Sequence, residues 1–527
     1  MFDETVVDLS RLQFAATALY HFLFVPLTLG LSVMLAIMET VYVVTGQEIY
    51  KRATKFWMHL FMINFALGVA TGLTMEVQFG MNWSYYSSFV GDTFGTLLAV
   101  EGLMAFFMES TFVGLMVFGW DRLSKGKHLV ITYLVALASN LSALWILVAN
   151  SFMQSPMGAE LNPITMRMEL ASFNDLFFNP DAQAKFVHTV IAGYVTAAVF
   201  VCGISAFYML RNRHMDIAKR SFRIAALFGV MGTAGVITLG DALGFIGGHA
   251  QPSKLAAMEA LWEPEKAPMS FNVIALPSQK EEKNLFDIQV PAFLSILVTH
   301  SLDGVVPSVQ ELQEEAKVRI HNGIPAVHAL EQLGRDPQDA HAMAIFEAHK
   351  DDIGYGLLVQ KYAPDGDLTQ ITEREVELAA KDTIPEVWAI FWAFRIMVGL
   401  GLLMLLYFVT AIVLTLSNKV HEKRWFLRAS VWMIPVPFIA CEMGWIVAEV
   451  GRQPWTVYEV LPTWLSASTH SVTYMIVSLI GFVLLYTVFA IIEVFLMTRK
   501  IKEGPPPASD LELQQRGLQT QTQLSAQ

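Results

Sequence analysis

ALYHFLFVPLTLG, residues 18–30, places His21 among aromatic and aliphatic side chains with no charged residue in the stretch. Such a stretch is typical of a helix buried in a membrane, where about 20 apolar residues cross a hydrocarbon core of about 30 Å. Ionisable side chains inside such helices are energetically costly and suggest a function. The rest of the sequence must therefore explain which fold surrounds His21 and what His21 binds.

The composition of the whole chain indicates the same class of protein. Of the 527 residues, 54% are hydrophobic and only 16% are charged, whereas charged residues make up about a quarter of a soluble domain. The net charge of −12 does not favour a nucleic-acid-binding protein, and we expect no nucleic-acid partner. Cys202 and Cys441 lie in separate apolar stretches without metal-ligand spacing, so we interpret both as buried thiols.

Apolar stretches long enough to span a membrane recur nine times. They lie near residues 14–44, 56–79, 93–119, 129–150, 186–210, 222–243, 388–416, 428–449 and 470–498. We therefore predict an all-α integral membrane protein with about nine transmembrane helices in bundles. Its predicted parts are a membrane domain over 1–243, an outer-side loop over 244–387, a second membrane part over 388–498 and a disordered tail over 499–527.

The distribution of basic residues predicts the orientation. Lys and Arg gather after the first, third, fifth, seventh and ninth spans, and the other short connections hold few. Because basic connections stay in the cytoplasm, we place the N-terminus outside and the C-terminus in the cytoplasm. The long connection then lies outside, and within it VQELQEEAKVRIHNGIPAVHALEQL (309–333) has the apolar spacing of a helix.

Five possible metal ligands fall inside five different predicted spans: His21, Glu101, His188, Met397 and Glu449. At a rise of about 1.5 Å per residue, the predicted topology puts all of them in the outer half of the membrane. Haem iron accepts histidine, or histidine with methionine, as axial ligands. The shared depth therefore points to haem, while helix packing is the alternative for each residue taken alone.

Further polar residues suggest proton transfer. Glu101 and Glu109 lie eight residues apart in the third span, about 80° apart around an α-helix and about 12 Å along it. Buried acids in such an arrangement can relay protons. Ser142 and Asn150 of the fourth span can hold water between the carboxylates, or they can simply join helices.

Arg395 precedes Met397 by two residues, so in a helix it points away from Met397 toward a propionate or a carboxylate. At the start of the outer loop, PSKLAAMEALWEP (252–264) sets Lys254 and Glu259 among apolar residues. They can bind and deprotonate the headgroup of a lipophilic quinol. A solvated helix face is the simpler interpretation of that stretch alone.

Seven stretches, in order along the chain, resemble subunit I of the cytochrome bd quinol oxidases. They are LSRLQFAATALYHFLFVPLTLG, NFALGVATGLTMEVQFGMNWSYY, EGLMAFFMESTFVGL, SNLSALWILVANSFMQ, KFVHTVIAGYV, FRIMVG and GRQPW. The resemblance covers the membrane part from the first span to the last, and the long loop has the length of the long-loop subclass.

The resemblance implies a multi-pass enzyme of the bacterial cytoplasmic (inner) membrane. Such an enzyme oxidises ubiquinol or menaquinol on the outer side and reduces dioxygen to water with cytoplasmic protons, which generates a proton motive force without pumping. The resemblance also implies three haems: a low-spin haem b, a high-spin haem b and haem d, a chlorin. The implied partners are subunit II, small single-span subunits and membrane lipid.

The resemblance assigns His188 and Met397 as the axial pair of the low-spin haem, with Arg395 beside it. His21 and Glu449 match the ligands of the two high-spin haems, and which residue binds which haem stays open. Trp445 and Arg452 match residues near the haems. As catalytic and quinol-binding residues, the resemblance implies Glu101 beside the oxygen-binding haem, Glu109 with Ser142 in a proton path, and Lys254 with Glu259 at the quinol.

One stretch departs from the family pattern. GDALGFIGGHA (240–250) keeps the Gly-Asp pair but lacks the polar residues and the tyrosine expected next, which puts details of the quinol pocket in doubt. Two other functions fit part of the sequence. A proton-coupled transporter would use the acids and Arg395 but leaves the shared depth of the histidines and Met397 unexplained. A haem-b electron conduit that does not react with oxygen has no need of His21 and Glu449, and a chlorin absorption band would exclude it.

Overall fold

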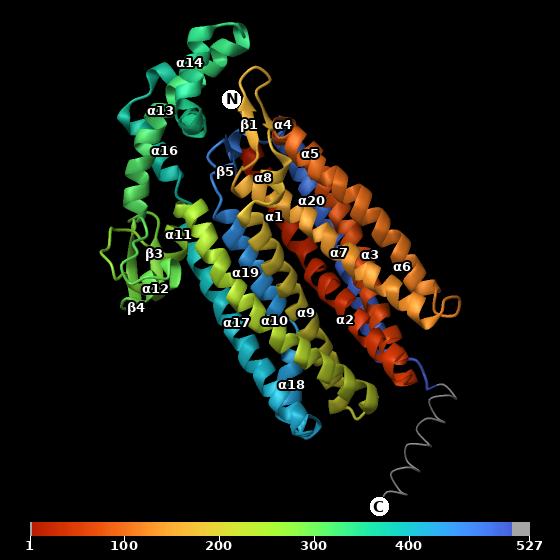
Figure 1. Cartoon of the computed structure of the whole chain (residues 1–527). Coiled ribbons are helices and arrows are strands. Elements are labelled where there is room, and N and C mark those ends of the chain that lie inside the picture. The colour runs from red at the N-terminus through yellow and green to blue at the C-terminus, as the bar shows by residue number, and fades with distance from the viewer. Residues whose placement is uncertain (1–2, 509–527) are drawn as a thin grey trace, which may run out of the picture.

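The computed structural model describes residues 3–508. Within this part, nine helical segments are long and apolar enough to cross a membrane, which confirms the predicted number. Figure 1 shows these segments running side by side in one bundle. Their helices are α1 (Glu4–Phe22) with α2 (Val25–Thr45); α3 (Glu48–Met81); α5 (Gly91–Val100) with α6 (Phe107–Phe118); α7 (Lys125–Gln154); α9 (Pro180–Leu210); α10 (Met215–Ala250); α17 (Val387–Leu416); α18 (Arg424–Trp432) with α19 (Val436–Val450); and α20 (Val472–Glu503).

Three of these segments are interrupted. The first breaks after Phe22, because Pro26 near the start of α2 has no N–H to donate to the carbonyl one turn back. Pro435 and Pro437 separate α18 from α19 in the same way. Between α5 and α6 lies a π-helix, η1 (Glu101–Phe106), whose i→i+5 hydrogen bonds place more residues in each turn than an α-helix has.

The membrane helices form two groups that meet along α2 and α9. In the second group, contacts run from α9 to α10, to α17, to α19 and back to α9, so these four helices form a closed ring. The two groups approach closely at Gly30 of α2. A Cβ at Gly30 would stand 2.5 Å from Ala197 Cβ and would clash with the carbonyl oxygen of Gly193, both on α9. Glycine is therefore required where the two backbones touch.

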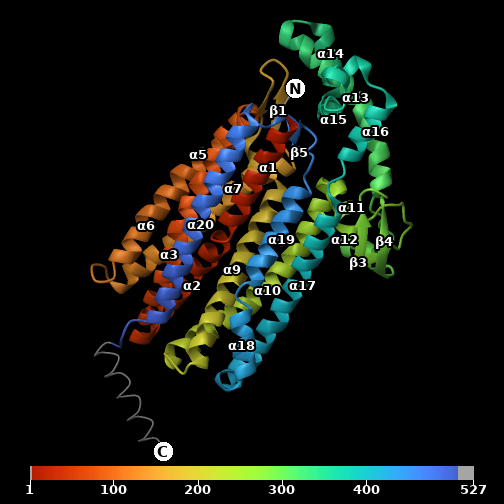
Figure 2. The same cartoon turned by 180° about the vertical axis from the view of Figure 1, so that it is seen from behind.

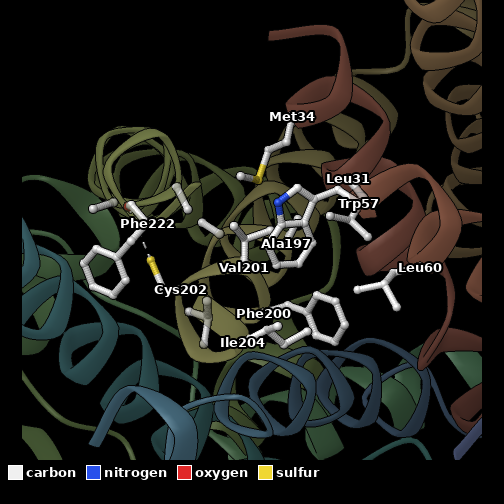
Figure 3. Packing of buried hydrophobic residues seen from close by; sticks show 14 of the residues in the cluster. Leu31, Met34, Trp57, Leu60, Ala197, Phe200, Val201, Cys202, Ile204 and Phe222 are labelled. Atoms are coloured by element: carbon white, nitrogen blue, oxygen red, sulfur yellow. Dashed lines mark hydrogen bonds between the residues drawn. The ribbon is translucent and has the colours of Figure 1, made fainter. Parts of the chain in front are cut away.

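The largest apolar core fills the space between α2, α3, α9 and α10 (Figure 3). Trp57 and Phe222 are fully buried in it. Trp57 Nε1 donates to Ser221 Oγ at 3.0 Å, so the polar atom of the indole is satisfied. Cys202 lies in the same core, and both Cys202 and Cys441 are free thiols; the interpretation as a buried thiol is confirmed for Cys202, whereas Cys441 is half-buried.

The segment between α10 and α17 folds at one end of the bundle, as Figures 1 and 2 show. Its inner part lies against the membrane helices α10 and α17, and its outer part is helical. The inner part consists of α11 (Pro252–Glu259), β3 (Phe271–Ser278), β4 (Lys283–Val290) and α12 (Phe293–Thr299). The outer part consists of α13 (Val309–Arg335), α14 (Ala340–His349), α15 (Ile353–Val359) and α16 (Glu373–Asp382).

Helix α13 confirms the helix that the apolar spacing of the loop predicts. A capping box begins it: Ser308 Oγ accepts from the Glu311 N–H at 3.3 Å, and the Glu311 carboxylate accepts from the Ser308 N–H at 2.9 Å. Arg319 on α13 then donates to Asp352 at 2.6 Å and pairs with Glu459 at 2.8 Å. Since Glu459 belongs to the connection between α19 and α20, this pair holds the outer part against the membrane domain.

The sequence analysis predicts no strands, yet the described part contains three two-stranded antiparallel hairpins. They are β3–β4, β1 (Ala159–Asn162) with β2 (Arg167–Leu170), and β5 (Trp455–Val457) with β6 (Leu461–Pro462). Pro277 stands inside β3, and proline normally argues against a strand, but a two-stranded hairpin has a free edge that tolerates it. The hairpins lie outside the nine apolar segments, as does the short helix α4 (Ser84–Phe89), and α8 (Phe173–Phe177) directly precedes α9, so the membrane part is all-α.

Most of the membrane helices extend beyond the predicted spans, and two of them change the predicted division into parts. α10 continues to Ala250, past the predicted end of the sixth span at 243, and α20 continues to Glu503, into the tail predicted as disordered from 499. The remaining part of that predicted tail, 509–527, lies outside the described residues. The start of α1 lies with the long loop at one end of the bundle, and α20 ends at the other (Figure 1), as an odd number of crossings requires.

Replacing Gly30 with alanine is expected to destabilise the protein, because the new methyl group would push α2 away from α9. We expect a loss of about 1–3 kcal/mol, measured as a lower thermal unfolding temperature of the purified complex in detergent. Gly481→Ala on α20 is the matched control, since a Cβ there meets no described atom within 4 Å and alanine favours a helix. Equal unfolding temperatures for the two variants would contradict the close approach.

Candidate functional site

His188 and Met397 lie on diagonally opposite members of the four-helix ring, His188 on α9 and Met397 on α17. The His188 ring packs against α10 at Gly240, where a Cβ would stand 3.2 Å from His188 Cε1. Met397 Sδ packs against α19 at Gly444, where a Cβ would stand 3.2 Å from the sulfur. Glycines thus leave space beside both side chains. An imidazole and a thioether from opposite helices are a donor set that suits haem iron.

His21 lies in the last turn of α1, just before the break in the first segment. Its Nδ1 is 2.9 Å from Thr71 Oγ1 on α3, and that hydroxyl donates to the carbonyl of Leu67 or Gly68, each at 3.0 Å. The imidazole therefore donates from Nδ1, which leaves the lone pair of Nε2 free for a metal. A Cβ at Gly72 would stand 3.6 Å from Nε2, so the glycine keeps this nitrogen accessible.

Glu449, in the last turn of α19, is held by three donors. Asn150 Nδ2 and Gln154 Nε2, both on α7, donate to Oε1 at 2.9 and 3.1 Å. Arg452 donates to Oε2 at 2.6 Å and also to the carbonyl of Thr456. These contacts fix the orientation of the carboxylate, as a metal-ligating carboxylate requires.

Trp445 links this region to His21. It lies one turn before Glu449 on α19, and its ring packs edge-on against Phe22 of α1 with centroids 5.0 Å apart. Phe22 follows His21 directly in the sequence. The structure therefore brings the end of α1 that carries His21 against the helix that carries Glu449.

Glu101 begins the π-helix and accepts a hydrogen bond from Ser142 Oγ on α7 at 2.6 Å. Glu109 is buried on α6. The predicted offset of about 80° between the two acids is wrong, because the π-helix between them has more residues per turn than an α-helix. Asn150, predicted to hold water near these acids, binds Glu449.

Arg395 joins α17 to the outer segment. Its guanidinium donates to Glu259 Oε2 at 2.7 Å, to the Met258 carbonyl at 3.1 Å and twice to the Asn272 carbonyl, at 2.6 and 2.9 Å. It also lies over the ring of Phe271, 4.4 Å from its centroid. Of the two partners expected for Arg395, the structure contains the carboxylate. Because the pair is buried, removing either residue would leave an uncompensated charge.

Lys254 and Glu259 are 9% and 1% exposed, so the interpretation of this stretch as a solvated helix face is wrong. Lys254 Nζ donates to Gln154 Oε1. Burial lowers the pKa of Lys254 well below its ordinary value. Burial also raises the pKa of Glu259, and the Arg395 guanidinium opposes that rise. Groups whose pKa values move toward neutrality can accept a proton from a weakly acidic hydroxyl near pH 7.

The candidate ligands are spread between helices. In residues 3–508, no three His, Cys, Asp or Glu side chains gather as they would around a bare metal ion. Single ligands and one diagonal pair suit planar iron macrocycles, which need only one or two axial ligands each. Both carboxylate oxygens of Glu442 on α19 are buried without a hydrogen-bond partner among the described residues. Buried polar atoms normally have a partner, so this carboxylate fits a site that holds a further group such as haem. The residues present therefore fit haem.

Two contacts of the site are absent from the sequence analysis. Thr71 sets the tautomer of His21, and no sequence pattern signals it, because the contact exists only once α1 packs on α3. Gln154 binds Glu449 together with Asn150. Here a signal was available, since the two amides are four residues apart and share one face of a helix.

Comparison with known proteins gives a consistent result. The family model described as cytochrome bd terminal oxidase subunit I matches residues 9–505. The chain is 51% identical over 513 residues to cytochrome bd-II ubiquinol oxidase subunit 1 of Escherichia coli (strain K12), covering 97% of this chain and 99% of that protein. It is 38% identical over 497 residues to cytochrome bd ubiquinol oxidase subunit 1 of Bacillus subtilis (strain 168), covering 94% and 93%. The structure of bd oxidase from Geobacillus thermodenitrificans has the same fold, with a TM-score of 0.76 at 24% identity over 96% of this chain and 100% of that one.

Replacing Gly240 with valine is expected to displace the His188 imidazole, because the added side chain would occupy the space beside it. We expect the haem absorption in the reduced-minus-oxidised spectrum of the purified complex to be reduced, if His188 holds a haem. Gly244→Val, one turn further along α10, is the matched control, since a Cβ there meets no described atom within 4 Å. If both variants lose the haem absorption, or if neither does, His188 does not hold a haem in the space beside Gly240.

Proposed function

The chain belongs to the cytochrome bd terminal oxidase subunit I family. We propose which of its residues bind haem, which bind quinol and which transfer protons. It is the haem-containing subunit of a terminal respiratory oxidase, a quinol:oxygen oxidoreductase of the bacterial inner membrane. As a subunit I, it works with a subunit II. Oxidation of quinol releases electrons and protons, and reduction of dioxygen to water consumes both.

The observation that carries the proposal is the placement of His188 and Met397 on opposite helices of the α9–α10–α17–α19 ring. These two residues would hold a low-spin haem b, which would supply one-electron transfer between the quinol site and the oxygen site. Arg395 lies two residues from Met397 and binds Glu259. The helix that carries the methionine is thus tied directly to the quinol-binding part of the loop.

His21 and Glu449 are the proposed ligands of the two other haems, a high-spin haem b and haem d, with neither residue assigned to one of them. Thr71 keeps Nε2 of His21 free for iron. The contact between Phe22 and Trp445 sets α1 beside α19, which lets the two ligands serve neighbouring groups. Arg452 balances the charge of the Glu449 carboxylate at 2.6 Å.

Lys254 and Glu259 are the proposed quinol-binding residues, for ubiquinol or menaquinol. Glu259, which is paired with Arg395, takes the proton of one quinol hydroxyl, while the Lys254 side chain binds a quinol oxygen. Both residues belong to α11, at the end of the bundle where the long loop folds (Figure 2). With the predicted topology, this end faces the outside, so the quinol protons are released there.

Glu101, Glu109 and Ser142 are proposed to carry protons to the oxygen site from the cytoplasm. Ser142 orients the Glu101 carboxyl through a 2.6 Å hydrogen bond, and Glu109 holds a proton one step nearer the other end of the bundle. Protons for water then come from the inside while quinol protons leave outside. This separation generates a proton motive force without a pump.

Small single-span subunits and membrane lipid are further proposed partners. The support is the apolar face of α20, where Val477, Leu484, Ile491 and Val494 are largely exposed. In a membrane, such a face is covered by lipid or by another apolar helix.

A reduced-minus-oxidised spectrum of the purified complex, with and without carbon monoxide, tests the haem assignment. We expect a far-red chlorin band that responds to carbon monoxide, and we expect His21→Ala to lose or alter a high-spin signal while the low-spin signal stays. His59→Ala is the control, because His59 is exposed and, within residues 3–508, its hydrogen bond goes to the carbonyl of Lys55 on its own helix. A wild-type spectrum with low-spin haem b alone would favour an electron conduit, and a spectrum without haem would refute the proposal.

The Arg395–Glu259 pair predicts a shift in pH dependence. The guanidinium lowers the pKa of Glu259 against the effect of burial, so Arg395→Gln raises that pKa further and Glu259 keeps its proton up to a higher pH. If Glu259 accepts the quinol proton, the acid limb of kcat/KM for quinol moves to higher pH, by about one unit or more. Arg395→Lys keeps a positive charge and should shift the limb less. An unchanged acid limb in Arg395→Gln would exclude Glu259 as the proton acceptor.

A further inference from the structure

Gln154 touches two parts of the site that the proposed function treats separately. It is the last residue of α7 and is 1% exposed. Its carboxamide oxygen accepts from Lys254 Nζ. Its amide nitrogen donates to Glu449 Oε1 and to the Ala448 carbonyl, both at 3.1 Å. The buried Gln154 side chain therefore contacts both Lys254, the proposed quinol-binding residue, and Glu449, a proposed ligand of haem iron.

The orientation of this carboxamide is set by its neighbours. A carboxamide has one acceptor end and one donor end. Rotated by half a turn, the oxygen of the Gln154 carboxamide would face the Glu449 carboxylate and the Ala448 carbonyl, which are both acceptors. Acceptors would then oppose acceptors in a buried place, where unpaired polar groups are costly. The observed orientation is the one that satisfies both ends at once.

The aliphatic part of the Lys254 side chain packs tightly against the backbone of Gly451. A Cβ at Gly451 would stand 2.8 Å from Lys254 Cγ and 2.9 Å from Lys254 Cε. In the described part of the chain, the hydrogen bond of Lys254 Nζ goes to Gln154. Glu449, in contrast, has a further donor on α7, Asn150. The two contacts of Gln154 can therefore be tested separately, because Asn150 binds Glu449 without touching Lys254.

We infer that Gln154 is a positioning residue that couples quinol binding at Lys254 to the Glu449 carboxylate. When a quinol oxygen approaches Lys254, the N–H groups of Nζ are shared between the quinol and Gln154. The carboxamide is a planar unit, so a change at its oxygen changes the hydrogen bond that its nitrogen makes to Glu449. Occupancy of the quinol site is thereby transmitted to the iron ligand through the protein. The inference rests on the proposed roles of Lys254 and Glu449.

The purified complex carrying Gln154→Leu tests the inference with two readouts. The first is the KM for a short-chain ubiquinol, which we expect to rise about tenfold with less change in kcat, because Lys254 loses its buried acceptor. The second is the high-spin haem absorption of the oxidised enzyme, with and without a short-chain ubiquinone. We expect the ubiquinone to shift this band in the wild type and not in Gln154→Leu.

Asn150→Leu is the matched variant. It also removes one donor from Glu449, so it should alter the high-spin band. Because Asn150 makes no contact with Lys254, this variant should keep the wild-type KM and the shift produced by ubiquinone. Gln154→Met, which is close to glutamine in length and volume, repeats the measurement if the leucine variant does not assemble.

The inference is overturned if the wild-type band does not respond to ubiquinone, or if the Gln154 variants keep the wild-type KM or the ubiquinone-induced shift. Two further variants separate this failure from a failure of the proposed function. If Lys254→Met keeps the wild-type KM for quinol, Lys254 does not bind quinol. If Glu449→Ala keeps its full haem content, Glu449 does not bind haem iron. Either result overturns the inference together with the proposed function. If both variants behave as proposed and the Gln154 variants do not, the inference alone is wrong.

Discussion

A polar side chain inside a membrane must find its partner within the protein, because the hydrocarbon core offers no water to solvate it. Glu39 shows the complete case: its carboxylate is 2.6 Å from both His128 Nδ1 and Thr132 Oγ1, and all three residues are buried. His21 and Glu442 show the incomplete case, since Nε2 of His21 is left free and both Glu442 oxygens lack partners among the described residues. Glu39 is thus satisfied by residues of the neighbouring helix α7, whereas His21 and Glu442 keep polar atoms with which they can bind a cofactor.

The same constraint explains how the loop and the membrane helices form one site. Lys254 and Glu259 are buried, so each needs a partner from the membrane part: Gln154 for the lysine and Arg395 for the carboxylate. These two contacts join α11 to α7 and to α17. Because Gln154 also binds Glu449, a movement of Lys254 on α11 would disturb a contact of Glu449. Two separate sets of hydrogen bonds thus hold α11 to the membrane helices, one through Gln154 and one through Arg395.

Much of the fold could be predicted from hydropathy and spacing, because those signals are local. The nine spans, helix α13 and the buried thiol of Cys202 belong to this class. The predictions that were wrong concerned geometry that a neighbouring segment decides. The angle between Glu101 and Glu109 assumed an α-helix where a π-helix exists. The solvated face considered for α11 ignored that α10, α13 and α17 pack on it.

The sequence by itself determined that the chain crosses a membrane, which side chains are too polar for their surroundings, and which family the chain resembles. The first two properties follow from residue type and from the 3.6-residue period of a helix, whereas the resemblance rests on seven matching stretches of sequence. Only the tertiary structure decided which partners those side chains have: Thr71 for His21, Glu259 for Arg395, and Gln154 between Lys254 and Glu449. The reason is physical, since each of these contacts joins residues 50 to 295 positions apart, and a hydrogen bond depends on distance and angle that no local pattern encodes.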